Sequence, residues 1–78
     1  MDINQFVENF IAQLDNEEGA AITAMTEFRS LEEWDSLVAL SIIAMVDEKY
    51  ATKLTGDDIK ASVTIADLFE KVKAKVAS

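Results

Sequence analysis

Neither cysteine nor histidine occurs in the 78 residues of this chain. Without cysteine there can be no disulfide bridge, no thiolate metal ligand and no cysteine nucleophile. Without histidine the chain lacks the commonest metal ligand and the usual general base. We therefore expect no metal site, no catalytic residue and no enzyme activity of its own.

Basic residues are scarce. Seven Lys and Arg stand against fifteen Asp and Glu, which gives a formal charge of −8. Lys71, Lys73 and Lys75 lie near the end, so residues 1–70 carry fifteen acids and four bases. This excess of negative charge repels nucleic acid and anionic lipid and favours partners with basic docking surfaces. It also serves solubility, which is the simpler explanation.

Long apolar runs are missing too. No segment approaches the length needed to span a membrane, and the N-terminus lacks the pattern of a signal peptide. We expect a cytoplasmic protein without membrane insertion. Half of the residues are hydrophobic and 28% are charged, which is globular composition. A chain of this size predicts a single domain over residues 1–78, a monomer, with no room for an enclosed catalytic pocket.

Two segments near the ends have helical periodicity. In residues 3–14 apolar side chains recur at spacings of three and four, and Asp2 can cap the first turn. Later, Thr64 and Asp67 resemble a capping box ahead of a second periodic set. The two sets are Ile3, Phe6, Val7, Phe10, Ile11 and Leu14, and Ile65, Leu68, Phe69, Val72 and Val76. The sequence predicts a helix over each.

A third helix is predicted from Ser36 to Tyr50, a mostly apolar segment without Gly or Pro that Asp35 can cap. Its two faces differ. Ala39, Ile42, Ile43, Val46 and Tyr50 suit the core, while Leu37, Leu40, Ser41, Ala44, Asp47 and Glu48 share the opposite face. The opposite face is a candidate docking surface, unless the preceding loop covers it.

The connections differ in length. Residues 15–35 show no sustained period and open with turn-forming residues, so we expect a long loop. Phe28, Leu31 and Trp34 are expected to anchor that loop in the core, through tucked side chains or a short helical turn, and Ile22 and Met25 to do likewise. Residues 51–56 read as a connector, after which Asp57, Asp58 and Ile59 open one short helical turn. The predicted fold is all-α: a small bundle of three main helices plus one short helix.

Trp34-Asp35-Ser36-Leu37 lies where the long loop meets the apolar helix. Ser36 should project from a helix N-terminus, where free N–H groups and the helix dipole favour a phosphate. Alternatively, Asp35 and Ser36 are capping residues and nothing more.

The whole chain resembles the acyl carrier protein family. The resemblance rests on an N-terminal helix, a long loop, Asp35-Ser36-Leu37 at the start of an apolar second helix that ends in Asp47, Glu48 and Tyr50, and two further helices. The passage from Phe28-Arg29 and from Leu31 to Leu37 is similar to that of stand-alone bacterial type II carriers.

The resemblance implies that a phosphopantetheinyl transferase moves a 4'-phosphopantetheine arm from coenzyme A to the Ser36 hydroxyl, with Asp35 helping to order the transferase's magnesium ion. The thiol of the arm, absent from the chain itself, would carry acyl intermediates as thioesters between enzymes of fatty-acid, polyketide or another specialised pathway.

In this family the second helix is the recognition element. The resemblance therefore implies that acyl-loading, condensing and acyl-transfer enzymes with basic docking surfaces contact Asp35, Leu37, Leu40, Ala44, Asp47 and Glu48. A thin core could also open and shelter an acyl chain among Ile42, Val46, Leu54, Ile59 and Phe69.

The chain departs from the family pattern at three positions. Val38 and Ser41 stand where many fatty-acid carriers have acids, which suggests a specialised pathway. Ala51 stands where many members have Gly, so a left-handed helix cap should form less easily. Two alternatives remain: an aminoacyl or peptidyl carrier, although Glu33-Trp34-Asp35 lacks the glycine usual there, or an unmodified helical adaptor.

Overall fold

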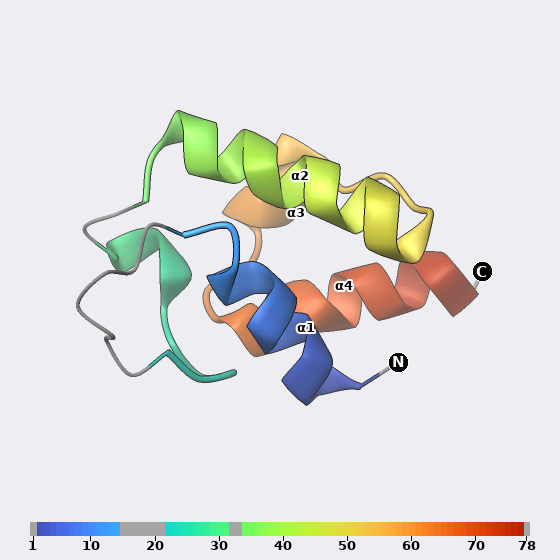
Figure 1. Ribbon diagram of the computed structural model, residues 1–78, viewed down its shortest axis with the longest axis horizontal. Helices are drawn as coiled ribbons and strands as arrows, with labels where there is room; N and C mark the ends of the chain where they lie inside the picture. Colours follow the sequence, from blue (N-terminus) through green and yellow to red (C-terminus); the bar gives the residue numbers. More distant parts are fainter. Residues whose placement is uncertain (1, 15–21, 32–33, 78) are drawn as a thin grey trace.

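The computed structural model describes residues 2–14, 22–31 and 34–77. Its elements are α1 (Ile3–Ile11), the 3-10 turn η1 (Phe28–Ser30), α2 (Ser36–Tyr50), α3 (Gly56–Lys60) and α4 (Ile65–Ala77). No strand occurs in these ranges, and the predicted all-α fold of three main helices and one short helix is confirmed. In Figure 1, α2 and α4 run in the same general direction, α1 runs opposite to them, and α3 lies behind α2. None of the helices in the described ranges has the length and apolarity needed to cross a membrane.

The core is built by the apolar faces of α1, α2 and α4, which contact one another pairwise. Phe6 and Phe10 of α1 are fully buried, and the ring of Phe6 meets the edge of the Phe69 ring at a centroid distance of 5.4 Å. The remaining buried hydrophobic residues are Val7, Leu14, Phe28, Ile42, Met45, Val46, Leu54, Ile59, Ile65, Leu68 and Val72. Burial of this apolar surface is the main driving force for folding.

The first helix is shorter than predicted. It ends at Ile11 rather than residue 14, because the N–H of Gln13 and that of Leu14 donate to carbonyls three residues back, Phe10 and Ile11, and form turns. Leu14 is nevertheless buried and belongs to the core. The apolar spacing of Leu14 therefore predicted its burial correctly but did not predict where the helix ends.

The second helix has the predicted bounds. The Asp35 carboxylate caps it by accepting a hydrogen bond from the Val38 N–H at 2.8 Å. At the other end Ala51 has φ 53°, in the left-handed region, and its N–H donates to the Asp47 carbonyl. The cap therefore forms without glycine, contrary to the expectation that Ala51 would disfavour it, and the cost is the steric strain of an alanine in that region.

The predicted core face of α2 is confirmed in outline. Ile42 and Val46 are fully buried, and Ala39, Ile43 and Tyr50 are half-buried. Met45, which the sequence analysis did not assign to either face, is also buried. Position 45 lies about one turn beyond Ile42 and next to Val46, so its side chain joins the same core cluster.

The described part of the long loop is anchored as predicted by Phe28, which is fully buried within η1, and by the half-buried Ile22, Leu31 and Trp34. Met25, however, is 71% exposed, and its expected anchoring is wrong. The turn that carries it is fixed through its backbone instead. Ile65 and Ala66, at the start of α4, donate their N–H groups to the carbonyls of Thr26 and Ala24. The turn-forming residues predicted at 15–19 lie outside the described residues.

Capping boxes begin both C-terminal helices. Thr55 and Asp58 cap α3 reciprocally, so this helix starts at Gly56, a residue expected in the connector, and one position before the predicted Asp57. For α4 the predicted box is confirmed. The N–H of Thr64 donates to the Asp67 carboxylate at 3.1 Å, and the Asp67 N–H donates to the Thr64 hydroxyl at 3.2 Å. Each box satisfies N–H groups that a helix start leaves without partners.

Candidate functional site

Ser36 is the first residue of α2 and is exposed. Asp35 before it is extended, with φ −153° and ψ −176°, which turns the chain into the helix at this point. Within the described residues the Ser36 hydroxyl has no hydrogen-bond partner. A hydroxyl at a helix N-terminus, open to solvent and not engaged in capping, is accessible to a modifying enzyme and favourably placed for a phosphate.

An aromatic cluster fixes the backbone just before Ser36. The indole of Trp34 stacks on the Phe10 ring at a centroid distance of 6.3 Å and an angle of 6°. It also meets the edge of the Phe28 ring at 5.1 Å. The two phenylalanines are fully buried, so Trp34 is held by the core although it lies beside the surface. The loop anchor and the position of Ser36 therefore depend on the same contacts.

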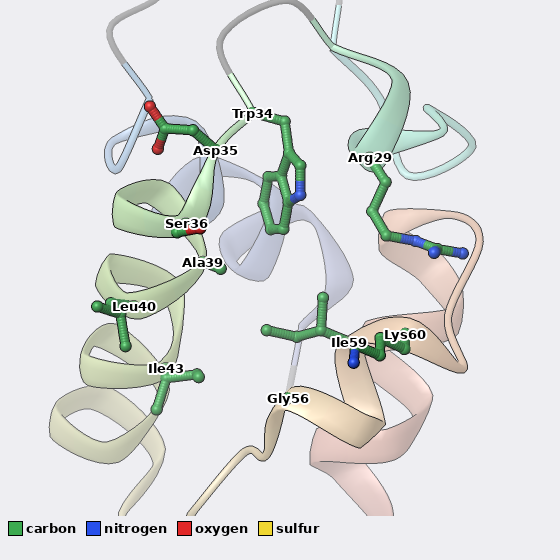
Figure 2. Close-up of a pocket in the computed structure, with 10 residues that line it drawn as sticks. All are labelled: Arg29, Trp34, Asp35, Ser36, Ala39, Leu40, Ile43, Gly56, Ile59 and Lys60. Carbon is green, nitrogen blue, oxygen red and sulfur yellow. The ribbon is translucent and has the colours of Figure 1, made fainter.

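A groove of about 630 Å³ opens beside Ser36. Figure 2 shows α2 along one side of it, α3 on the other, and the Trp34 indole between Ser36 and Arg29. Most of its exposed lining is apolar. The lining residues are Arg29, Trp34, Asp35, Ser36, Ala39, Leu40, Ile43, Gly56, Ile59 and Lys60.

The α3 wall of the groove is tied down from two sides. The Asp58 carboxylate accepts hydrogen bonds from the N–H and the hydroxyl of Thr55. It also forms an ion pair with Lys75 Nζ of α4 at 3.1 Å. Behind α3, the fully buried Ser62 donates its hydroxyl to the Asp58 carbonyl, and its own carbonyl accepts from Arg29 Nε at 3.2 Å. These bonds join η1, α3 and α4 around the groove.

Two carboxyl groups in the caps are tuned by these bonds. Partial burial raises the pKa of Asp58, but the hydrogen bonds from Thr55 and Lys75 and the charge of Lys75 outweigh it and hold that pKa below its ordinary value. The backbone N–H groups of Thr64 and Val63 likewise lower the pKa of Asp67. Both carboxylates are ionised at neutral pH and stabilise the starts of their helices.

The outward side of α2 is open. Leu37 is 73% exposed and Leu40 is 61% exposed, so the described part of the long loop does not cover this face. Asp35, Ala44, Asp47 and Glu48 are exposed as well. The six residues expected to contact partners therefore lie at the surface on one helix, with an apolar pair beside the Ser36 end.

The residues expected to line an acyl pocket are core residues, and that expectation stays a prediction. Ile42, Val46, Leu54, Ile59 and Phe69 are all buried in the core, and of these Ile59 alone also lines the groove. Sequence reasoning did not find Arg29, Ala39, Ile43, Gly56 and Lys60 as neighbours of Ser36. The groove joins three elements that are distant in sequence, and no periodicity within one helix can report that juxtaposition.

A comparison with known families identifies the family of the chain. The family described as "Phosphopantetheine attachment site" matches residues 5–72. A search of curated proteins and a search of solved structures each returned no match. The residues present fit the prosthetic group, because an unpartnered serine hydroxyl stands at the N-terminus of α2 beside a mostly apolar groove. The chain therefore belongs to the phosphopantetheine attachment-site family, as an acyl carrier protein family member whose prosthetic group is covalently attached 4'-phosphopantetheine.

Proposed function

We propose that Ser36 bears the phosphopantetheine and that the chain carries acyl groups between enzymes without catalysing a reaction itself. The observation that carries this proposal is the exposed Ser36 hydroxyl, which has no partner within the described residues and stands at the N-terminus of α2. When bound, the group supplies a terminal thiol for thioester-linked cargo, a sulfur nucleophile that this cysteine-free chain lacks.

The residues around Ser36 have distinct parts in this function. The start of α2 offers the positive end of a helix dipole to the phosphodiester. One oxygen of Asp35 accepts the Val38 N–H, and the side chain is otherwise exposed, so its second oxygen is available to order the transferase's magnesium ion. Trp34 holds this junction in place through Phe10 and Phe28.

The outward face of α2 supports a docking role. Asp35, Asp47 and Glu48 place negative charge along it, and Leu37, Leu40 and Ala44 supply apolar contact area. Partner enzymes with basic docking surfaces, among them the phosphopantetheinyl transferase and acyl-loading, condensing and acyl-transfer enzymes, would be attracted by charge and held by brief apolar burial. Complexes of this kind release quickly, as a carrier with several successive partners requires.

The proposal extends to the setting in which the chain works. Val38 and Ser41, both half-buried, leave α2 without two acids that many fatty-acid carriers have, which supports a specialised acyl pathway. The family match over residues 5–72 supports one carrier domain over residues 1–78. That the domain acts as a monomer in the cytoplasm is part of the proposal.

Intact-mass spectrometry of the protein purified from its source, under conditions that preserve thioesters, tests this function. We expect a mass above the unmodified chain by one phosphopantetheine, roughly 340 Da from its covalent structure, together with the mass of an acyl group. An amino-acid load would replace the acyl assignment by an aminoacyl carrier. A chain that is entirely unmodified in its source would contradict the carrier function and favour a binding adaptor.

A further inference from the structure

The groove beside Ser36 has two chemically different parts. The side chains of Trp34, Ala39, Ile43 and Ile59 make most of its lining apolar. Arg29 and Lys60 line it as well, and Figure 2 shows both of them on the far side of the groove from Ser36, with Trp34 between Ser36 and Arg29 and Lys60 next to Ile59. An extended group attached at Ser36 would therefore pass an apolar surface before it meets positive charge.

These two cations are a notable fraction of the chain's positive charge. The sequence has seven basic residues against fifteen acids, and two of the seven line this one groove. In the part of the chain that the structure describes, neither Arg29 nor Lys60 belongs to an ion pair. As far as the described residues go, these charges are therefore available to a group that enters the groove.

Arg29 is held in place for such a contact. Its Nε donates to the carbonyl of Ser62, a fully buried residue, at 3.2 Å. That bond fixes the guanidinium beside α3, and within the described residues its two terminal nitrogens have no hydrogen-bond partner. A guanidinium fixed through Nε binds a carboxylate with less loss of side-chain entropy than a free one. Lys60 adds a second positive charge from α3.

We propose that this groove holds the acyl cargo tethered at Ser36, and that Lys60 and Arg29 select cargo whose free end is a carboxylate. The inference rests on the proposed function and names the class of substrate. A wholly apolar acyl chain would pack against Trp34 and Ile59 but would partly desolvate the two cations without pairing them. A dicarboxylic acyl chain of matching length places its apolar carbons against that lining and its charge beside the cations.

The phosphodiester of the arm is a second possible source of negative charge. It is anchored on Ser36 at the N-terminus of α2, where the helix itself favours an anion. Arg29 and Lys60 belong to η1 and α3, on the other side of the groove. The cargo is joined to Ser36 through the whole arm, so its free end meets these cations when the arm folds back along the groove, whereas the phosphodiester stays at the start of α2.

The test loads the protein in vitro from two coenzyme A thioesters of equal carbon number, hexanoyl and adipoyl, the latter labelled with ¹³C at its free carboxyl. The pKa of that carboxyl is followed by NMR and compared with adipoyl-pantetheine in solution. We expect it to fall by roughly 0.2 to 0.7 pH unit, which is the range of exposed ion pairs converted at about 1.36 kcal/mol per unit. Emission of Trp34, the one tryptophan of the chain, should also change on loading.

The matched variants are Lys60→Gln and Lys53→Gln. Lys53 is exposed in the connector before α3 and does not line the groove. Lys60→Gln should make the decrease in the carboxyl pKa measurably smaller, with Arg29 keeping the rest, and Lys53→Gln should leave the decrease as in the wild type. Arg29 is left unchanged because its bond to Ser62 helps to fix α3.

Each negative result of this experiment contradicts a different statement. If the protein cannot be loaded at all, the proposed function itself fails. If it loads but the adipoyl carboxyl titrates as in solution, or Trp34 emission is the same as in the unloaded holo form, the cargo assignment is wrong. If Lys60→Gln moves the ³¹P resonance of the phosphodiester and leaves the carboxyl pKa unchanged, the cations serve the arm rather than its cargo.

Discussion

At the scale of single residues, the consecutive residues Trp34, Asp35 and Ser36 differ in how many contacts their side chains make. Trp34 is fixed by ring contacts with Phe10 and Phe28, and Asp35 is engaged through one carboxylate oxygen. The Ser36 hydroxyl that follows is exposed and has no partner within the described residues. The backbone before Ser36 is therefore held by packing and capping while the hydroxyl is accessible, and at the attachment point that we propose a transferase would meet a positioned but unhindered nucleophile.

Ala51 is the residue at which the backbone is most clearly strained. It has φ 53° at the end of α2, whereas Ala61 ends α3 with an ordinary φ of −81°. We predict that Ala51→Gly stabilises the protein by about 0.5 to 1 kcal/mol, because glycine adopts this conformation without a Cβ clash. Urea unfolding followed by far-UV circular dichroism measures the change.

Ala61→Gly is the control for that substitution. Glycine there relieves no strain and only increases the conformational entropy of the unfolded chain, so we expect a loss of about 0.5 to 1 kcal/mol. A loss of similar size in both variants would show that the left-handed geometry at Ala51 is not present in solution.

At the scale of helices, the caps connect the short helix α3 to the rest of the protein. Asp58 caps α3, pairs with Lys75 of α4, and has a lowered pKa because the hydrogen bonds and this charge outweigh partial burial. A carboxyl whose pKa is lower in the folded than in the unfolded state stabilises the protein above its unfolded pKa. That stabilisation is lost as the pH falls through the folded pKa.

We therefore predict that stability decreases between about pH 5 and pH 2, with Asp58 and Asp67 both contributing. Asp58→Asn should lower stability at neutral pH by a few tenths of a kcal/mol to about 1 kcal/mol, and should make the remaining acid loss smaller. Thermal unfolding at a series of pH values tests this. Asp57→Asn, at an exposed neighbour outside the capping box, should leave the acid loss as in the wild type.

The outward face of α2 leads to a prediction about docking. Leu40 is 61% exposed, so Leu40→Ser should change the free energy of unfolding by less than about 0.5 kcal/mol. If partners contact this face, kcat/KM of the transferase should fall by roughly three- to tenfold, since a buried contact at an interface is typically worth about 1 kcal/mol or more.

Val63→Ser provides the comparison for Leu40→Ser. Val63 is also an exposed hydrophobic residue, 49% accessible, but it lies between α3 and α4 rather than on α2. Its substitution should leave transferase kinetics unchanged. Equal losses in the two variants would mean that general surface hydrophobicity, and not the face of α2, governs the encounter.

At the scale of the whole molecule, long-range contacts join elements that are far apart in the chain. Asn9 of α1 donates a hydrogen bond to the Tyr50 hydroxyl at the end of α2, at 3.0 Å, and the Tyr50 ring contacts Phe6 at a centroid distance of 5.7 Å. Arg29 and Ser62 similarly join η1 to the segment after α3. The first link joins α1 to α2, and the second joins two elements beside the groove.

Tyr50→Phe removes the hydroxyl and keeps the ring contact with Phe6. We predict a loss of about 0.5 to 1.5 kcal/mol, the usual net contribution of such a hydrogen bond. A double-mutant cycle with Asn9→Ala measures the pairwise part of this loss. A coupling energy indistinguishable from zero would mean that the bond between the two helices does not form in solution.

The helices and their caps were predictable because they depend on local patterns. Asp35, Thr64 and Asp67 were recognised as capping residues from sequence alone, and the bounds of α2 were predicted correctly. The end of α1 was not, because Leu14 has the right apolar spacing but is buried from a turn. Periodicity reports which side chains face the core, not where the hydrogen-bond pattern stops.

The site was predictable only in part. Ser36 stood out because of its motif and its place at the start of a helix, and the exposed face of α2 followed from a helix with two apolar sides. The groove did not, because Arg29, Ile43 and Lys60 come from three elements and meet only after the bundle packs. The prediction that the Met25 side chain anchors the loop was wrong for a related reason. Backbone hydrogen bonds from Ile65 and Ala66 fix the turn, so an apolar anchor at Met25 is not needed.

The attachment of the prosthetic group to Ser36 is the central claim, and one experiment tests it directly. Purified wild type, Ser36→Ala and Ser30→Ala are incubated with coenzyme A, magnesium and a broad-specificity phosphopantetheinyl transferase, and their intact masses are measured. Ser30 is another exposed serine, located in η1. We predict a gain of roughly 340 Da in the wild type and Ser30→Ala and none in Ser36→Ala. A gain in Ser36→Ala, or no gain in any of the three with several transferases, would contradict it.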